Sequence, residues 1–132
     1  MKIYIVKETT IDEKRVSLVP DVAKKFIKDG FDVFLEKDAG YMSKFTDEDY
    51  SSLGVNIDDN HENISDADII FCVRMPDDNL INKIKSGACL IGLLNPYDNK
   101  EKLELLSKKG INAFSMELIP RSPRAQSMDV LS

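Results

Sequence analysis

The sequence predicts an α/β protein built on a doubly wound, mostly parallel open sheet, and three observations indicate it. Short apolar and β-branched runs alternate with segments whose apolar residues recur at helical spacing. A glycine stands after several of the predicted helices, immediately before the next strand. Residues 69–73 and 89–94 are apolar on both pleat faces apart from Gly92, which is typical of parallel strands covered on both sides.

The first strand is predicted over residues 2–6, an apolar and β-branched run. The next helix begins at Pro20, because proline presets φ and has no amide hydrogen to satisfy in the first helical turn. Its predicted apolar face consists of Val22, Ala23, Phe26 and Ile27. Gly30 ends this helix, and residues 31–35 form the second strand.

A second helix is predicted to start at Thr46, because Thr46 and Asp49 resemble a capping box with the shorter acid. It ends at Gly54 and leads into the short apolar segment 55–57. The remaining predicted elements are a strand over 68–73, a helix over 77–85, a strand over 88–94, a helix over 98–109 and a strand over 111–116.

Length and composition favour a single globular domain that does not bind nucleic acid. The chain has 132 residues, with 18 Lys and Arg against 23 Asp and Glu, so its net charge is −5. Neutralising phosphates needs clustered positive charge, which this balance does not favour. No apolar run approaches the ~20 residues of a membrane span. There is no secretory leader pattern, and Cys72 and Cys89 lie in apolar runs, so we expect reduced core cysteines in an intracellular protein.

Two kinds of cofactor site are not predicted within this chain. Its six glycines are too widely spaced to form G-x-G-x-x-G or a phosphate-binding loop, so no dinucleotide fingerprint is present. His61 is the only histidine, and we interpret it as a solvated loop residue. Without a second histidine, and with both cysteines in apolar runs, no metal site is expected.

Ligands of a parallel sheet gather at the carboxyl ends of its strands, so the segments after residues 6, 73 and 94 are the places to look for function. Those segments carry Lys7, Glu8, Arg15, Arg74 and Asn95. Polar residues that end strands are also common for structural reasons alone, and this alternative stays open for Arg74 and Asn95. The tail from residue 120 can be a disordered terminus or a helix start with Ser122 as cap and Pro123 in the first turn.

Three stretches carry a resemblance to a known family. The opening contains Lys7-Glu8, then Glu13-Lys14-Arg15-Val16, then Pro20; Ala39-Gly40 precedes Phe45-Thr46-Asp47; and the tail contains Met116-Glu117-Leu118-Ile119-Pro120-Arg121 and Arg124-Ala125-Gln126-Ser127-Met128-Asp129-Val130-Leu131-Ser132. The first two stretches resemble alanine dehydrogenases and nicotinamide nucleotide transhydrogenases alike. The tail resembles the transhydrogenases, specifically the N-terminal part of their NAD(H)-binding alpha subunit (domain I).

The resemblance implies a function. Such enzymes transfer hydride between NAD(H) and NADP(H), coupled to proton translocation. Residues 1–119 would form the N-terminal α/β domain, and residues 120–132 a cofactor-facing loop that leads to a Rossmann domain outside this chain. The chain then looks like a fragment that is inactive alone. It implies NADP(H)-binding and membrane proton-channel partner domains, a homodimer in the full protein, and a place on the cytoplasmic or organelle-matrix face of the inner membrane.

The same resemblance assigns the cofactor contacts to the tail. Arg121, Gln126, Asp129 and Ser132 match the loop that reaches the nicotinamide end of NAD(H). The residue types suit this role, because an amide such as Gln126 both donates and accepts without titrating, and Arg121 and Asp129 can contact the pyrophosphate and the ribose. Pro123 departs from the family pattern and stiffens the loop.

Two alternatives remain. An alanine dehydrogenase-like oxidoreductase would retain Arg15 for the substrate carboxylate, but the resemblance places Arg74 and Asn95 where that family has its lysine and catalytic histidine. Arginine is too basic to shuttle protons and asparagine does not titrate. A non-enzymatic, flavodoxin-like signalling module would need an aspartate directly after the third predicted strand, where Arg74 and Met75 stand.

Overall fold

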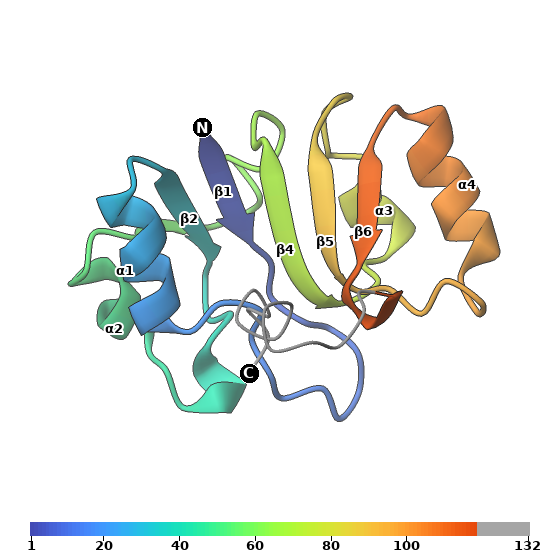
Figure 1. Cartoon of the computed structure of the whole chain (residues 1–132). Coiled ribbons are helices and arrows are strands. Elements are labelled where there is room, and N and C mark those ends of the chain that lie inside the picture. Colours follow the sequence, from blue (N-terminus) through green and yellow to red (C-terminus); the bar gives the residue numbers. More distant parts are fainter. Residues whose placement is uncertain (119–132) are drawn as a thin grey trace.

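A computed structural model describes residues 1–118 of the chain as one six-stranded sheet with helices (Figure 1). The strands are β1 (Lys2–Ile5), β2 (Asp32–Glu36), β3 (Asn56–Asp58), β4 (Ile69–Arg74), β5 (Cys89–Leu93) and β6 (Asn112–Ser115). Their order is β3-β2-β1-β4-β5-β6, and every neighbouring pair is parallel. The predicted fold class is therefore confirmed, and the segment after Gly54 adds a sixth strand at one edge.

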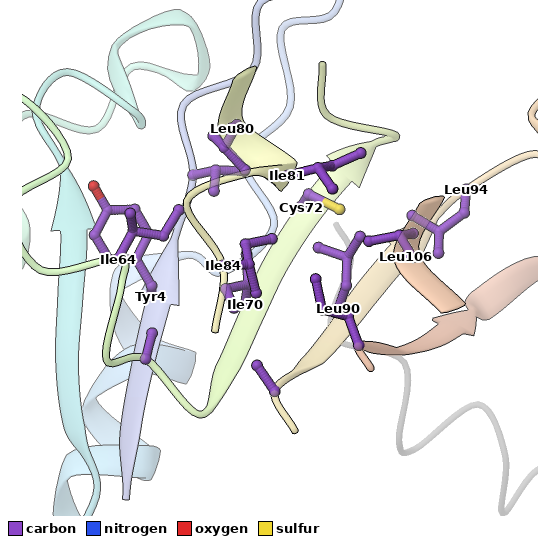
Figure 2. Close-up of a cluster of buried hydrophobic side chains, with 14 residues drawn as sticks. Tyr4, Ile64, Ile70, Cys72, Leu80, Ile81, Ile84, Leu90, Leu94 and Leu106 are labelled. Atoms are coloured by element: carbon purple, nitrogen blue, oxygen red, sulfur yellow. The ribbon is translucent and has the colours of Figure 1, made fainter. Parts of the chain in front are cut away.

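The helices lie on both faces of the sheet. They are α1 (Pro20–Lys28), α2 (Asp47–Ser51), α3 (Asp78–Ile81) and α4 (Lys100–Lys108), with 3-10 turns η1 (Tyr41–Ser43) and η2 (Met116–Leu118). Ile3 and Ile5 pack in one buried cluster with residues of α1 and α2. Tyr4 faces the other way and shares a second cluster with residues of α3 and α4, drawn in Figure 2. This alternation along β1 is the doubly wound arrangement.

The prediction that β5 is covered on both faces was wrong in part. Leu90 on the α3 side is fully buried, but Ile91 on the α1 side is only half-buried. The next side chain in that row, Phe114 of β6, is 53% exposed. The cause is the distribution of helices: α1 and α2 pack over β1 and β2, whereas α3 and α4 lie on the opposite face.

Helix starts follow the predicted chemistry more closely than helix ends. Pro20 opens α1, and Thr46 and Asp49 form the reciprocal capping box at α2. The helix predicted over 77–85 is shorter, because α3 ends at Ile81. Beyond that point Ile84 turns into the core, and its amide donates to the Ile81 carbonyl three residues back, which tightens the chain out of α-helical geometry.

Both cysteines are free, as predicted, but only one belongs fully to the core. Cys72 is completely buried and Cys89 is half-buried. Burial raises the pKa of the Cys72 thiol well above its usual value. Gly92 lies against this residue so closely that an added Cβ would stand 2.6 Å from the Cys72 Sγ. The single glycine within the β5 run is therefore a close-packing residue.

Candidate functional site

The carboxyl ends of all six strands lie at one edge of the sheet (Figure 1). β1 and β4 are neighbours there although they lie more than 60 residues apart in sequence. The chain builds β2 and β3 on one side of β1, then returns to build β4, β5 and β6 on the other, so this edge contains the switch point at which such sheets form crevices. The fold brings Glu8 and Arg15 beside Arg74, as their positions after predicted strands indicated.

Glu8 ties the loop after β1 to the end of β4. Its carboxylate accepts hydrogen bonds from the backbone amides of Val73 and Arg74, at 2.9 and 2.8 Å. Burial raises the pKa of the Glu8 carboxyl, and these two amide hydrogen bonds oppose the rise. Glu8 therefore places a carboxylate at the switch point itself.

Glu13 is held by two arginines. Arg15 binds it with a fork, Nε to Oε2 at 3.0 Å and Nη2 to Oε1 at 2.9 Å, and Arg74 adds Nε to Oε1 at 2.7 Å. The Glu13 side chain is 4% exposed, whereas those of Arg15 and Arg74 are 41% and 50% exposed. The hydrogen bond from Arg15 is the main cause that lowers the pKa of Glu13 to about 2. Both arginines were predicted from the sequence as candidate site residues, but the carboxylate between them was not.

His61 was wrongly interpreted as a solvated loop residue. Its Nε2 lies 3.0 Å from Glu36 Oε1 at the end of β2, and its Nδ1 lies 2.8 Å from the Lys83 Nζ. A lysine ammonium has only donors, so Nδ1 accepts from Lys83 and the proton on Nε2 is donated to Glu36. His61 thus joins the segment before β4 to both β2 and the turn after α3. No local sequence signal could reveal this, because the partners lie 25 and 22 residues away.

A small cavity lies on the α3 side of the switch point. It encloses about 70 Å³, and its lining includes Lys7, Glu36, His61, Arg74 and Asn79. Binding pockets for drug-sized ligands occupy ≈ 300–1,000 Å³, so the cavity suits a few waters or a small ion rather than a dinucleotide. The Glu36 carboxylate also accepts from the Lys7 amide at 3.2 Å. This edge offers carboxylates where a dinucleotide would need donors for its phosphates.

Asn95 follows β5 and serves the turn there. Its backbone is in the left-handed region, with φ of 47°. Its amide hydrogen is directed to the Glu117 carboxylate, and its side-chain Nδ2 donates to Asp98 Oδ2 at 2.9 Å. Glu117 also accepts from the Leu94 amide at 3.0 Å. Asn95 is exposed and next to the switch point, and its side chain has no group that titrates.

The predicted cofactor contacts Arg121, Gln126, Asp129 and Ser132 lie outside the described residues. Among residues 1–118, no three His, Cys, Asp or Glu side chains gather in a way that could hold a metal ion. Over the same range, no helix combines the length and the apolar character needed to cross a membrane.

Comparison with known proteins gives consistent matches over the whole chain. Residues 4–132 match the family described as "Alanine dehydrogenase/PNT, N-terminal domain". The chain is 37% identical over 132 residues to NAD(P) transhydrogenase subunit alpha of Haemophilus influenzae, covering 100% of this chain and 26% of that protein. It is 30% identical over 132 residues to alanine dehydrogenase 1 of Staphylococcus aureus (strain Mu50), covering 100% of this chain and 35% of that protein.

A higher identity is found to a transhydrogenase whose alpha subunit is divided between polypeptides. The chain is 40% identical over 139 residues to the first part of NAD(P) transhydrogenase subunit alpha from Rickettsia prowazekii (strain Madrid E), covering 100% of this chain and 36% of that protein. The chain thus spans only a quarter to about a third of the length of the curated relatives it matches.

The fold has a close counterpart among solved structures. The crystal structure of transhydrogenase from Sinorhizobium meliloti superposes with a TM-score of 0.92 at 36% identity, covering 98% of this chain and 39% of that one.

Proposed function

Because the chain belongs to the family of alanine dehydrogenase/PNT N-terminal domains, we propose that it is the N-terminal part of the NAD(H)-binding alpha subunit of a proton-translocating NAD(P) transhydrogenase. The complete enzyme would transfer hydride between NAD(H) and NADP(H). Since the chain corresponds to roughly a third of its relatives, we propose that residues 1–119 are one domain of a longer subunit and that they are inactive alone.

The observation that favours this function over amino-acid oxidation is the chemistry at the ends of β4 and β5. Deamination through an imine needs a group that gives and takes protons near neutral pH. Arg74 ends β4, and its guanidinium stays charged while it binds Glu13. Asn95 follows β5 and does not titrate. Direct hydride transfer needs no general base, only two rings held face to face at near-attack distance.

The cofactor would be held mainly by a second domain. The described residues do not fit a dinucleotide pyrophosphate, because the Glu8 carboxylate already accepts from the Val73 and Arg74 amides at the switch point. We therefore propose that a glycine-rich Rossmann domain binds the pyrophosphate and adenosine of NAD(H), and that residues 120–132 extend from this domain toward the nicotinamide.

Within that loop, the residue types assign the contacts. We propose that the Gln126 amide holds the nicotinamide carboxamide, since it can donate and accept at once. Arg121 would brace the pyrophosphate with charge-assisted hydrogen bonds, and Asp129 would accept from ribose hydroxyls. Ser132 would add a hydroxyl contact to the same end of the nucleotide. Gln126 is the member of this set that we propose acts in hydride transfer.

The partners follow from the proposed reaction. NADP(H) would bind a separate domain, and a membrane domain would carry the protons. The alpha subunit would be a homodimer, lying at the cytoplasmic or organelle-matrix face of the inner membrane through its partner domains. These proposals rest on the alpha-subunit relatives, of which this chain covers only a portion.

Two assays test the proposed function. The complete enzyme should reduce an NADP⁺ analogue with NADH and should release no ammonia from L-alanine with NAD⁺. Alanine-dependent NAD⁺ reduction in the absence of transhydrogenation would assign the chain to the alanine dehydrogenases instead. The isolated chain should bind NADH very weakly at most, and sub-micromolar affinity would show that the cofactor site has been misplaced.

A further inference from the structure

Two half-exposed guanidiniums share one nearly buried carboxylate at the switch point. Glu13 accepts three side-chain hydrogen bonds, two from Arg15 and one from Arg74, all between 2.7 and 3.0 Å. Its side chain is 4% exposed, so it is almost fully enclosed by the groups around it. Such an arrangement of planar forks around one carboxylate is the way in which arginines recognise carboxylate ligands.

The pair retains unused binding capacity. A guanidinium has five N–H donors. Arg74 uses only its Nε on Glu13, and among residues 1–118 no side-chain hydrogen bond involves either of its terminal nitrogens. Half of the Arg74 side chain is open to solvent. The donors that face outward could therefore engage an anion that reaches this edge of the sheet.

The second carboxylate of the cluster does not compete for these donors. Glu8 directs both oxygens to the Val73 and Arg74 backbone amides rather than to a guanidinium. Its charge is felt by Arg15 only through space. Glu13 is thus the one carboxylate in the described cluster that ligates both arginines through their side chains.

We propose that Arg15 and Arg74 form a binding site for small carboxylates whose occupant in this chain is Glu13. A free acid would compete for the same donors. Glu13 wins this competition because it is only two residues from Arg15, which gives it a high effective concentration that a dilute acid does not match. Glu13 is therefore a specificity-determining residue: it keeps small monocarboxylates and dicarboxylates, including 2-oxo acids, out of the switch point. This inference concerns the described residues and does not depend on the proposed transhydrogenase activity.

The test removes the internal ligand and supplies an external one. Unfolding of the 132-residue chain is measured for the parent and for Glu13→Ala in formate, acetate or oxalate, against chloride at equal ionic strength. A ligand that binds only the folded chain raises the folding equilibrium constant by the factor 1 + [L]/Kd, about 11-fold at ten times its Kd. Glu13→Ala should show this saturable gain, and the parent should change by less than about twofold.

Matched variants separate a two-arginine site from a simple excess of positive charge. Asp66→Ala also removes a carboxylate from an ion pair, but it leaves a single ammonium, that of Lys2. It should gain nothing from carboxylates over chloride. The double variant Glu13→Ala/Arg74→Ala should lose the gain seen in Glu13→Ala. A response to carboxylates in Glu13→Ala no larger than that of Asp66→Ala, or one that survives removal of Arg74, would overturn the proposal.

Failure of Glu13→Ala to fold in chloride is also informative. Recovery of its folding in formate would support the proposal, because the external carboxylate would replace the missing side chain. Glu13→Gln keeps the side-chain length, and oxalate should then shift the Arg74 Nε–Hε resonance in a saturable way. No recovery of Glu13→Ala in formate, together with an unshifted Arg74 resonance in Glu13→Gln, would refute it.

Discussion

Three tyrosine hydroxyls provide a graded test of how the loops at the carboxyl edge are held. The Tyr4 hydroxyl, drawn in Figure 2, donates to Asp58 Oδ2 at 2.6 Å, with Tyr4 fully buried and Asp58 only 2% exposed. The Tyr50 hydroxyl donates to the Leu18 carbonyl at 2.8 Å, also in the interior. Tyr97 is 79% exposed. Tyr→Phe at each position removes one oxygen and leaves the ring in place.

The expected losses differ because the acceptors differ. Hydrogen bonds to charged groups contribute ≈ 1.5–3 kcal/mol, so Tyr4→Phe should lower the free energy of unfolding by about 2 kcal/mol or slightly more. The Asp58 carboxylate would keep only its hydrogen bonds from the Asn63 side chain and amide. Tyr50→Phe loses a bond to a neutral carbonyl, worth about 1 kcal/mol. Tyr97→Phe is an exposed change and should stay within ~0.5 kcal/mol of the parent.

Urea unfolding of the 132-residue chain measures all three differences. With a slope of about 1–3 kcal/mol per molar urea, Tyr4→Phe should lower the midpoint by roughly 1 M. The required order is Tyr4→Phe most destabilising, Tyr50→Phe next and Tyr97→Phe least. A Tyr4→Phe variant as stable as the parent, or less affected than Tyr50→Phe, would refute the argument that a buried charged acceptor makes the stronger hydrogen bond.

Three further predictions concern packing, pH and the cofactor loop. Gly92→Ala should destabilise the chain by about 1–3 kcal/mol in urea unfolding, because the new Cβ overlaps Cys72; an unchanged midpoint would contradict this. The pKa of Glu13 is lowered from 4.5 to about 2 in the folded chain, so its stabilisation is present above pH 4.5 and is lost as the pH falls toward 2. Glu13→Gln should remove that portion of the stability–pH curve, and a curve parallel to the parent's would rule out the assignment. In the complete enzyme, Gln126→Asn should slow single-turnover hydride transfer about 10²-fold while NADH binding changes little, since a displacement of ~1 Å in a positioning group can cost that much; a rate within twofold of the parent would remove Gln126 from the proposed role.

Elements with a local signal could be predicted from the sequence. The apolar runs located five of the six strands, and the Thr46–Asp49 pattern located the start of α2, because both depend on residues a few positions apart. β3 was not predicted as a member of the sheet. It has only three residues, and its last one, Asp58, is a buried carboxylate whose Tyr4 partner lies 54 residues away. No local pattern reports such a pairing.

The candidate site divides in the same way. Positions after strands correctly brought Glu8, Arg15 and Arg74 to one place, since topology alone decides that placement. The partner of each side chain was not predictable, because it depends on loop conformation. Glu13 became the common ligand of both arginines through one contact only two residues away and another 61 residues away. The residues proposed for the cofactor rest on resemblance, and they remain predictions.

One pattern recurs at three strand ends and explains why this domain would need a partner to bind a dinucleotide. The backbone amides after β1, β4 and β5 each find a carboxylate of this chain: Glu36 accepts from Lys7, Glu8 from Val73 and Arg74, and Glu117 from Leu94. In nucleotide-binding sheets, free amides at this edge are the donors that cradle phosphates. Here those donors are already satisfied, and the groups that satisfy them are carboxylates, which would repel a pyrophosphate. The edge can therefore face the neutral nicotinamide end of a cofactor more readily than its charged centre, which is the division of labour that the proposed two-domain subunit requires.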